Sequence, residues 1–190
     1  MSLPVFYTKQ FPPSIIRVGP LHEHRDLIPT VAKNLFNEWE ILYKQENIHS
    51  VNELEQNLNK RCDNYPNLPL TFVAIINNNE LAGTISIDKE DLPLPSSPYH
   101  SKSPWLASVF VLESYRNLGV AAALISSCEF AARARFSCLW LWTVKSVELY
   151  QKFGWKIIEE IYFPVKQKNI TIMRKDFNSE EKQSEENEES

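Results

Sequence analysis

Apolar positions in the first third of the chain recur at helical intervals. Between residues 27 and 43 they are spaced three or four apart, which is typical of a helix with one buried face. The run Ser50-Val51-Asn52-Glu53 matches a capping box, so a second helix is expected to begin there. A short apolar run at residues 15–18 predicts a strand before the first helix.

Two β-rich runs follow, at residues 71–76 and 81–87. The polar residues 77–80 separate them, and this pattern predicts a hairpin. Residues 91–104 are rich in proline and serine and are expected to form a loop without regular structure.

The second half of the chain alternates apolar runs with helix-forming segments. Residues 105–111 are almost all apolar, as expected of a strand buried on both faces. The later elements are expected to be an alanine-rich helix at 119–136, a strand at 139–144, a short helix at 146–153 ending at Gly154, and an antiparallel pair at 155–163 and 169–174. This order predicts a mixed α/β (α+β) layer protein without internal repeats.

Length and composition fit one globular domain. The chain has 190 residues, 43% of them hydrophobic, and we expect one domain over residues 15–176 behind an extension at 1–14. Residues 177–190 form an acidic tail that is expected to be disordered. Six glutamates and one lysine lie in this tail, so the formal net charge of −4 leaves the rest of the chain near +1.

Composition also argues against several classes of protein. No basic stripe predicts binding to nucleic acid, and no segment has the length and apolarity to span a membrane. The histidines are scattered along the chain, and the three cysteines form no CxxC pair and no pattern with histidine. No metal is therefore expected. An odd cysteine count without a signal peptide predicts reduced thiols and a cytoplasmic location.

The segment with the clearest chemistry joins the apolar strand at 105–111 to the helix at 119–136. The chain has only four glycines, and Gly119 lies where this helix begins. Free N–H groups and the helix dipole make a helix N-terminus attractive to anions. Small residues at Gly119 and Ala121 are expected to let a pyrophosphate approach the backbone, with Arg116 adding positive charge. The glycine patterns of Rossmann folds and of Walker P-loops are both absent.

At these residues the sequence resembles the GNAT superfamily of N-acetyltransferases. Arg116, Gly119 and Ala121 match the phosphate-binding motif Gln/Arg-x-x-Gly-x-Gly/Ala of that family. Tyr150 and the pair Gly154-Trp155 resemble its second signature. The resemblance implies the acyl-CoA N-acyltransferase fold, with a central, mostly antiparallel sheet flanked by helices, and acetyl-CoA as co-substrate.

The resemblance also implies the residues that hold acetyl-CoA. In the family, the strand matching Val109 to Val111 bulges, and its backbone binds the pantetheine arm and the thioester carbonyl. The residues after it then hold the pyrophosphate. The cofactor-binding residues expected here are Val109, Phe110, Val111, Arg116, Asn117, Leu118, Gly119, Val120, Ala121 and Thr143.

Tyr150 occupies the position of the family's proton donor to the departing CoA thiolate, so it is the expected catalytic residue. A phenol is protonated at neutral pH and able to donate. The base that deprotonates the amine is not identified by the sequence, and a water chain remains an alternative. The candidates are Glu40, Glu90, Asp91 and Glu159.

The acceptor groove is expected to be lined by aromatic residues of the first helix and of the closing hairpin. These are Trp39, Tyr43, Tyr162 and Phe163. A primary amine of a small molecule is the expected acceptor. A peptide or protein N-terminus is the alternative, and a non-catalytic sensor of acetyl-CoA is another. A homodimer is possible, since many proteins of the family pair through their last strands.

Overall fold

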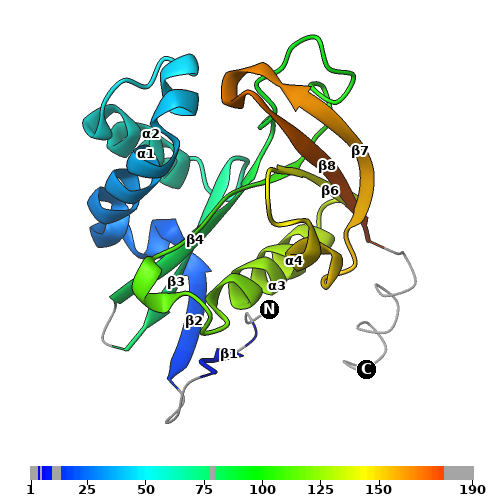
Figure 1. Ribbon diagram of the computed structural model, residues 1–190. Helices are drawn as coiled ribbons and strands as arrows, with labels where there is room; N and C mark the ends of the chain where they lie inside the picture. Colours follow the sequence, from blue (N-terminus) through cyan, green and yellow to red (C-terminus); the bar gives the residue numbers. More distant parts are fainter. Residues whose placement is uncertain (1–3, 5, 10–13, 78–79, 178–190) are drawn as a thin grey trace. The chain divides into compact units, whose positions relative to one another are not determined.

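The protein is described by a computed structural model that covers residues 4, 6–9, 14–77 and 80–177 (Figure 1). The chain forms two compact units. Unit 1 contains Met1–Asp88 and Ala107–Cys128, and unit 2 contains Lys89–Leu106 and Glu129–Ser190. The acidic tail lies outside the described residues apart from Phe177, and the division into extension, domain and tail stays a prediction.

The sheet of unit 1 begins earlier in the chain than the sequence indicated. Phe6 pairs with Ile16, within the segment that we assigned to an extension. Each of the first four strands is antiparallel to the next, and the fifth follows the fourth in strand order. These strands are β1 (Phe6–Tyr7), β2 (Ile15–Pro20), β3 (Leu70–Ile76), β4 (Glu80–Asp88) and β5 (Trp105–Val111), which belongs to unit 1 from Ala107 onward.

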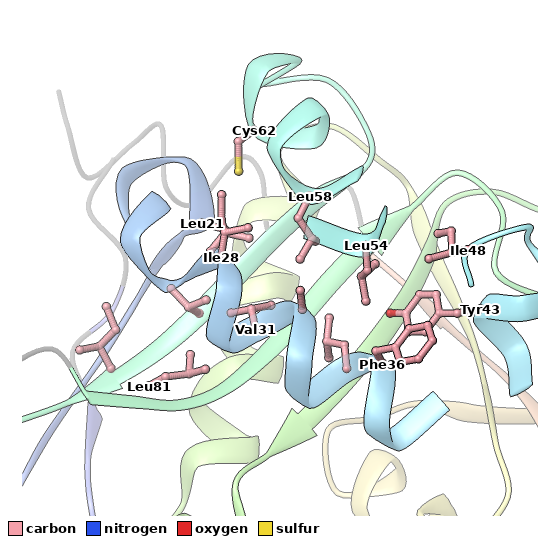
Figure 2. Close-up of a cluster of buried hydrophobic side chains, with 14 residues drawn as sticks. Leu21, Ile28, Val31, Phe36, Tyr43, Ile48, Leu54, Leu58, Cys62 and Leu81 are labelled. Atoms are coloured by element: carbon pink, nitrogen blue, oxygen red, sulfur yellow. The ribbon is translucent and has the colours of Figure 1, made fainter. Parts of the chain in front are cut away.

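Two helices cover β3 and β4 on one face. They are α1 (Ile28–Gln45) and α2 (Val51–Asp63), and their apolar stripes pack with Val73, Ile75 and Leu81 of the sheet (Figure 2). Burial of these stripes removes apolar surface from water and is the main source of stability for this unit.

The capping box at the start of α2 is confirmed. The Ser50 hydroxyl accepts a hydrogen bond from the Glu53 N–H at 3.2 Å. The Glu53 carboxylate accepts one from the His49 N–H at 2.6 Å. The two side chains thus satisfy backbone donors that the first helical turn cannot.

A register shift between Ala74 and Ile75 interrupts the β3–β4 pairing. Such a shift changes which side chains point to each face of a sheet. It explains why Leu81 packs in the α1/α2 core whereas Gly83, two residues later, faces Leu124 of α3 (Val120–Arg133). The α3 helix belongs to unit 1 up to Cys128.

Unit 2 is built around three strands in the order β6-β8-β7, each antiparallel to its neighbour. The first residue of β5, Trp105, pairs in parallel with Trp140 of β6. The elements of this unit are β6 (Cys138–Thr143), α4 (Val147–Gln151), β7 (Lys156–Phe163) and β8 (Lys168–Asp176). Among the residues that the structure describes, the short 3-10 helices are η1 (Leu21–Glu23), η2 (Arg25–Leu27), η3 (Glu113–Tyr115) and η4 (Pro164–Lys166).

The predicted fold class is confirmed, because helices and mostly antiparallel strands alternate as a mixed α/β arrangement. The predicted loop at 91–104 contains no helix or strand. Helix lengths were less accurate: α3 ends at Arg133, and α4 has five residues followed by turns.

A buried polar network fixes the end of α3 within unit 2. Glu129 is 4% exposed and accepts hydrogen bonds from the Trp155 indole at 2.6 Å and from the Lys175 ammonium at 2.5 Å. The same ammonium donates to the Phe153 carbonyl at 2.6 Å. A buried carboxylate is stable only when paired in this way, so the network holds helix, turn and strand together.

Candidate active site

The strand β5 contains a break in its regular conformation at Ser108, where φ is +52°. A non-glycine residue in the left-handed region is uncommon, and inside a strand it produces a bulge. The first three residues of β5 are buried, and the residues from Ser108 to Val111 are half-buried. The bulge therefore occurs just before Val109, where the family resemblance implied it, and Ser108 itself was missed by the sequence analysis.

Two hydrogen bonds hold this bulge. The Thr84 hydroxyl of β4 donates to the Ser108 carbonyl at 3.2 Å. The Ser108 side chain is hydrogen-bonded to Tyr43 of α1. Because the contacts come from a neighbouring strand and from a covering helix, the bulge depends on the folded unit and not on local sequence.

Gly83 of β4 lies directly against the segment after the bulge. A Cβ at this position would be 2.5 Å from the Phe110 carbonyl oxygen and 3.3 Å from the Val111 Cα. Only glycine allows β4 and β5 to approach this closely. Gly83 thus sets the position of a strand segment expected to bind the cofactor. Its place in the middle of a β-rich run was the available signal.

The loop from β5 to α3 contains two left-handed residues, Asn117 with φ +62° and Gly119 with φ +94°. The chain then enters α3 at Val120, whose first N–H groups have no acceptor within the helix. Alternating backbone conformations before a helix N-terminus form a concave set of N–H donors that favours an anion. The residues that the motif named thus form a turn with this backbone geometry, and anion binding by the turn stays a prediction.

Arg116 has a defined local role in this turn. Its Nε donates to the Val111 carbonyl at 3.2 Å, so the side chain links the end of β5 to the loop. Gly119 is needed for its φ and not for steric space, because a Cβ there would meet Tyr7 O and Lys9 Cγ at 3.8 and 3.9 Å. These are ordinary contacts, whereas a positive φ disfavours any side chain.

The N-terminal segment lies along the same loop. The Lys9 N–H donates to the Leu118 carbonyl at 3.1 Å. Thr8 is buried, and its N–H donates to the Ser14 carbonyl at 2.7 Å. The Ser14 N–H in turn donates to the Thr8 hydroxyl at 2.7 Å. Residues that we had assigned to an extension therefore support the turn that leads into α3.

A surface pocket of about 700 Å³ lies beside this segment, within unit 1. From α1 it is lined by Asn34, Asn37 and Glu38, and its other wall runs from Phe110 to Arg116. The pocket thus combines amide and carboxylate groups with one aromatic ring and the cationic Arg116, and it suits a polar, charged ligand better than an apolar one.

The helix α1 is interrupted opposite the bulge. Trp39 has φ −128° and ψ 31°, outside the helical region, although helix continues on both sides. Its ring contacts the Phe110 ring edge-on, with centroids 6.3 Å apart. One turn later, Tyr43 lies in the core beside Phe36 (Figure 2). Its side chain is hydrogen-bonded to Ser108. The predicted aromatic wall from α1 therefore adjoins the bulge, with Tyr43 buried and Trp39 half-buried.

Charged groups gather around Tyr43. Arg61 of α2 is bonded to the Asp88 carboxylate at 2.9 Å, and this pair is largely buried. Burial raises the pKa of Asp88, while the Arg61 guanidinium opposes that shift. Glu46, just after α1, keeps contact with solvent, yet partial desolvation raises the pKa of its carboxyl and the Asp88 charge adds to this, against the effect of Arg61. Burial likewise raises the pKa of Tyr43, so its phenol stays protonated at neutral pH.

In unit 2, Tyr150 is in α4 and is 7% exposed. Its ring contacts that of Trp155 edge-on at 6.0 Å, and its carbonyl accepts from the N–H groups of Phe153 and Trp155. The second signature thus forms one tight turn, with Gly154 at φ +79°. The Thr143 hydroxyl accepts from the Ser146 N–H at 3.1 Å at the start of the same segment.

Two of the four carboxylates that the sequence suggested as bases, Glu40 and Glu159, interact with another side chain. Glu40 is exposed and forms a salt bridge with Lys44 at 2.6 Å. Glu159 accepts a hydrogen bond from the Tyr99 hydroxyl at 2.9 Å. Glu90 is exposed, and the Asp91 carbonyl accepts from the Trp142 indole at 3.1 Å.

The two aromatic residues expected from the closing hairpin differ in exposure. Tyr162 is 59% exposed, whereas Phe163 is fully buried against Trp142, with ring centroids 5.4 Å apart. Phe163 is therefore a core residue, and its interpretation as a groove wall is wrong.

Among the described residues, no three or more histidine, cysteine, aspartate or glutamate side chains are arranged to hold a metal ion. None of the helices in the described ranges has both the length and the apolar character needed to cross a membrane.

Several solved structures share this fold. A mutant form of spermidine/spermine N-acetyltransferase from Vibrio cholerae aligns with a TM-score of 0.60 and 17% identity, over 84% of this chain and 93% of that chain. The dodecameric spermidine N-acetyltransferase of the same organism aligns with a TM-score of 0.61 and 17% identity, over 85% of this chain and 93% of that chain. A putative acetyltransferase from an Exiguobacterium species aligns with a TM-score of 0.54 and 18% identity, over 85% of this chain and 93% of that chain.

The sequence matches no curated protein. It does match the family model described as acetyltransferase (GNAT) family, over residues 33–155. This stretch is more than half of the chain, and it contains the bulged strand, the turn predicted to bind an anion and the Tyr150 segment. The chain belongs to the GNAT family of acetyltransferases, enzymes that use acetyl-CoA as co-substrate.

Proposed function

We propose that this protein transfers the acetyl group of acetyl-CoA to a primary amine of a small molecule. The observation that carries the proposal is the continuous segment in which a bulged strand leads, through two left-handed residues, into the N-terminus of α3. The bulge provides backbone groups for a thioester and its pantetheine arm, and the turn provides N–H donors for a pyrophosphate.

The proposed cofactor contacts follow the family pattern. Backbone groups of Val109, Phe110 and Val111 would bind the pantetheine arm, and the segment from Arg116 to Ala121 the pyrophosphate. Support comes from the half-buried state of the strand after Ser108. Thr143 is retained as a proposed contact on the basis of the resemblance alone.

Chemistry at this site needs a neutral amine, stabilisation of the thioester oxygen as negative charge develops, and a proton for the departing thiolate. We assign the last role to Tyr150. The assignment rests on the family signature, on the presence of a phenol there, and on the tight turn that fixes its backbone.

We propose a small amine as the acceptor on one feature. Two of the similar solved structures are named as spermidine N-acetyltransferases, although their identity to this chain is below one fifth. The pocket of unit 1 does not decide the acceptor, because its Phe110 and Arg116 are proposed cofactor contacts.

A cytoplasmic location and a homodimer remain proposals. The cysteines Cys62, Cys128 and Cys138 form no disulfide bond with one another, which supports a reducing environment.

The test is a calorimetric titration of acetyl-CoA into the purified protein and into Arg116→Glu. We expect micromolar binding to the intact protein and strong loss in the variant, because a carboxylate would lie beside bound phosphates and the Val111 contact would be absent. Lys60→Glu, an equal charge reversal on the exposed side of α2, is the matched control and should bind normally. No binding by the intact protein would refute the function.

A screen of primary amines, read out as release of free CoA thiol, then tests turnover. We expect Tyr150→Phe to bind acetyl-CoA normally and to lose about 10²-fold or more in kcat. Equal turnover by this variant would exclude Tyr150 as the proton donor. Binding without turnover of any amine would favour the sensor alternative.

A further inference from the structure

The turn that follows Tyr150 is held at two points by side chains from outside it. The Trp155 indole N–H donates to the Glu129 carboxylate at 2.6 Å, at the end of α3. The Phe153 carbonyl accepts from the Lys175 ammonium of β8 at 2.6 Å. The ammonium and the carboxylate are bonded to each other at 2.5 Å. All of these residues belong to unit 2, so a helix end and a strand of that unit together hold the turn.

The two residues held in this way are the ones that contact Tyr150. The Tyr150 carbonyl accepts from the N–H of Phe153 at 2.9 Å and from the N–H of Trp155 at 3.2 Å. The Tyr150 ring meets the Trp155 ring edge-on, with centroids 6.0 Å apart. Both rings are buried, at 7% and 2% exposure. A displacement of Trp155 therefore acts on Tyr150 through its backbone and through its ring.

The network that holds the turn is polar, although its surroundings are buried. Glu129 is 4% exposed, and apolar side chains of similar size can stabilise such a place as well as an ion pair does. Hydrogen bonds to charged groups add direction, because they are short and require good alignment. One carboxylate oxygen of Glu129 accepts from the indole and the other from the Lys175 ammonium, so both sides of the carboxylate are fixed.

We propose that Glu129, Lys175 and Trp155 are positioning residues that orient the Tyr150 phenol for proton donation to the departing CoA thiolate. This inference rests on the proposed function, in which Tyr150 is the proton donor. A proton donor has to lie within hydrogen-bond reach of the reacting atom, so its orientation bears directly on the rate. Glu129 and Lys175 lie outside the segment that the family resemblance singled out, and the sequence gave them no role.

The step that these residues serve is balanced in atoms and charge. The neutral amine forms a C–N bond to the thioester carbonyl carbon, the C–S bond breaks, and its electron pair leaves on sulfur. The sulfur takes the proton of the Tyr150 hydroxyl. The nitrogen releases one proton to solvent, and the phenolate takes a proton back from solvent.

The first test is Trp155→Phe in the full chain, with the amine found in the screen. This change removes the indole N–H and leaves an aromatic ring and the Glu129–Lys175 pair in place. A misplacement of about 1 Å costs about 10²-fold in rate. We expect kcat to fall by between about 10-fold and the about 10²-fold loss expected of Tyr150→Phe. The Kd for acetyl-CoA and the KM for the amine should stay unchanged.

A double-mutant cycle separates positioning from a general structural role. If Trp155 acts through the Tyr150 phenol, Trp155→Phe should cause no further loss of kcat in the Tyr150→Phe background. A structural role alone would lower kcat by the same factor in both backgrounds.

Two variants of Glu129 then test the bond itself. Glu129→Gln keeps an oxygen that can accept from the indole and should retain most of kcat. Glu129→Ala lacks this acceptor and should lower kcat as Trp155→Phe does.

Ser50→Ala is the control for lost stability. It removes a helix cap in unit 1, far along the chain from the turn, and should leave kcat unaltered. Circular dichroism melting of every variant measures folding, and rates are compared per folded protein.

The outcomes distinguish this inference from the proposed function. If Trp155→Phe keeps full kcat, or if its loss multiplies with that of Tyr150→Phe, the positioning role is refuted and the acetyltransferase function stands. If Trp155→Phe weakens acetyl-CoA binding and leaves kcat unchanged, the network belongs to cofactor binding and the inference is overturned. If Tyr150→Phe turns over normally, or no amine is acetylated, the phenol has no such role and the inference fails while cofactor binding remains. If the intact protein does not bind acetyl-CoA, both proposals fail together.

Discussion

The contact between Gly83 and Phe110 allows a sharp test of how β4 positions the candidate cofactor strand. In Gly83→Ala the new methyl group would start 2.5 Å from the Phe110 carbonyl oxygen, 3.1 Å from Leu124 Cδ1 and 3.3 Å from Val111 Cα. The leucine terminus can rotate away, but the two backbone atoms cannot. The strand β5 itself therefore has to move after its bulge.

The size of this movement follows from the contact. Ordinary van der Waals contact begins near 3.4 Å, so β5 has to shift by about 0.9 Å relative to β4. Overpacking of this kind costs about 1–3 kcal/mol of unfolding free energy. A misplacement of about 1 Å in a segment that orients a reactant costs about 10²-fold in rate. We therefore expect a folded but less stable protein with weaker acetyl-CoA binding and a kcat/KM about 10²-fold lower.

Urea unfolding gives the stability change, and calorimetric titration gives the Kd for acetyl-CoA. The matched control is Gly19→Ala in β2, where the nearest atom to a new Cβ is the end of the His24 side chain at 3.1 Å. Because the His24 side chain can rotate away, Gly19→Ala should lower the unfolding free energy by less than about 1 kcal/mol and should bind acetyl-CoA normally. Equal stability and equal affinity in Gly83→Ala and the intact protein would refute the reasoning about strand position.

Three other predictions concern the stability of each unit. Glu129→Ala leaves the half-buried Lys175 ammonium without its carboxylate and the Trp155 indole without its acceptor, and it should lower the unfolding free energy by about 3 kcal/mol, measured in urea. Ser50→Ala removes the hydroxyl that caps the Glu53 N–H and should cost about 1 kcal/mol in the same assay. Because burial raises the pKa of Tyr43 above that of the unfolded chain, the unfolded state ionises first and stability should fall as pH rises above about 10. Tyr43→Phe should flatten that decline, and an unchanged slope would contradict it.

The order of elements could be predicted from the sequence because each has a strong local pattern. The run from Trp105 to Val111 is apolar throughout and forms a strand with the predicted bounds. The capping box at Ser50 places the start of α2 to the residue. In both cases the decisive interactions lie within a few positions along the chain, where periodicity and capping rules apply.

The features that shape the candidate site depend on residues far apart in the sequence. A serine within an apolar strand gives no local sign that it adopts a positive φ, as Ser108 does. The strand at Phe6–Tyr7 has two residues, too few for a periodic signal. The Arg61–Asp88 ion pair is likewise invisible in the sequence, because it exists only after α2 and β4 have packed.

The energetics of the bulge explain why it is built from such distant contacts. A non-glycine residue in the left-handed region costs about 1–3 kcal/mol. Each net hydrogen bond returns about 0.5–1.5 kcal/mol, so the bonds of Ser108 to Thr84 and Tyr43 together offset a cost of that size. With mid-range values, one hydrogen bond alone offsets only about half of the free-energy cost of the left-handed residue. The bulge is therefore stable only when β4 and α1 are both in place.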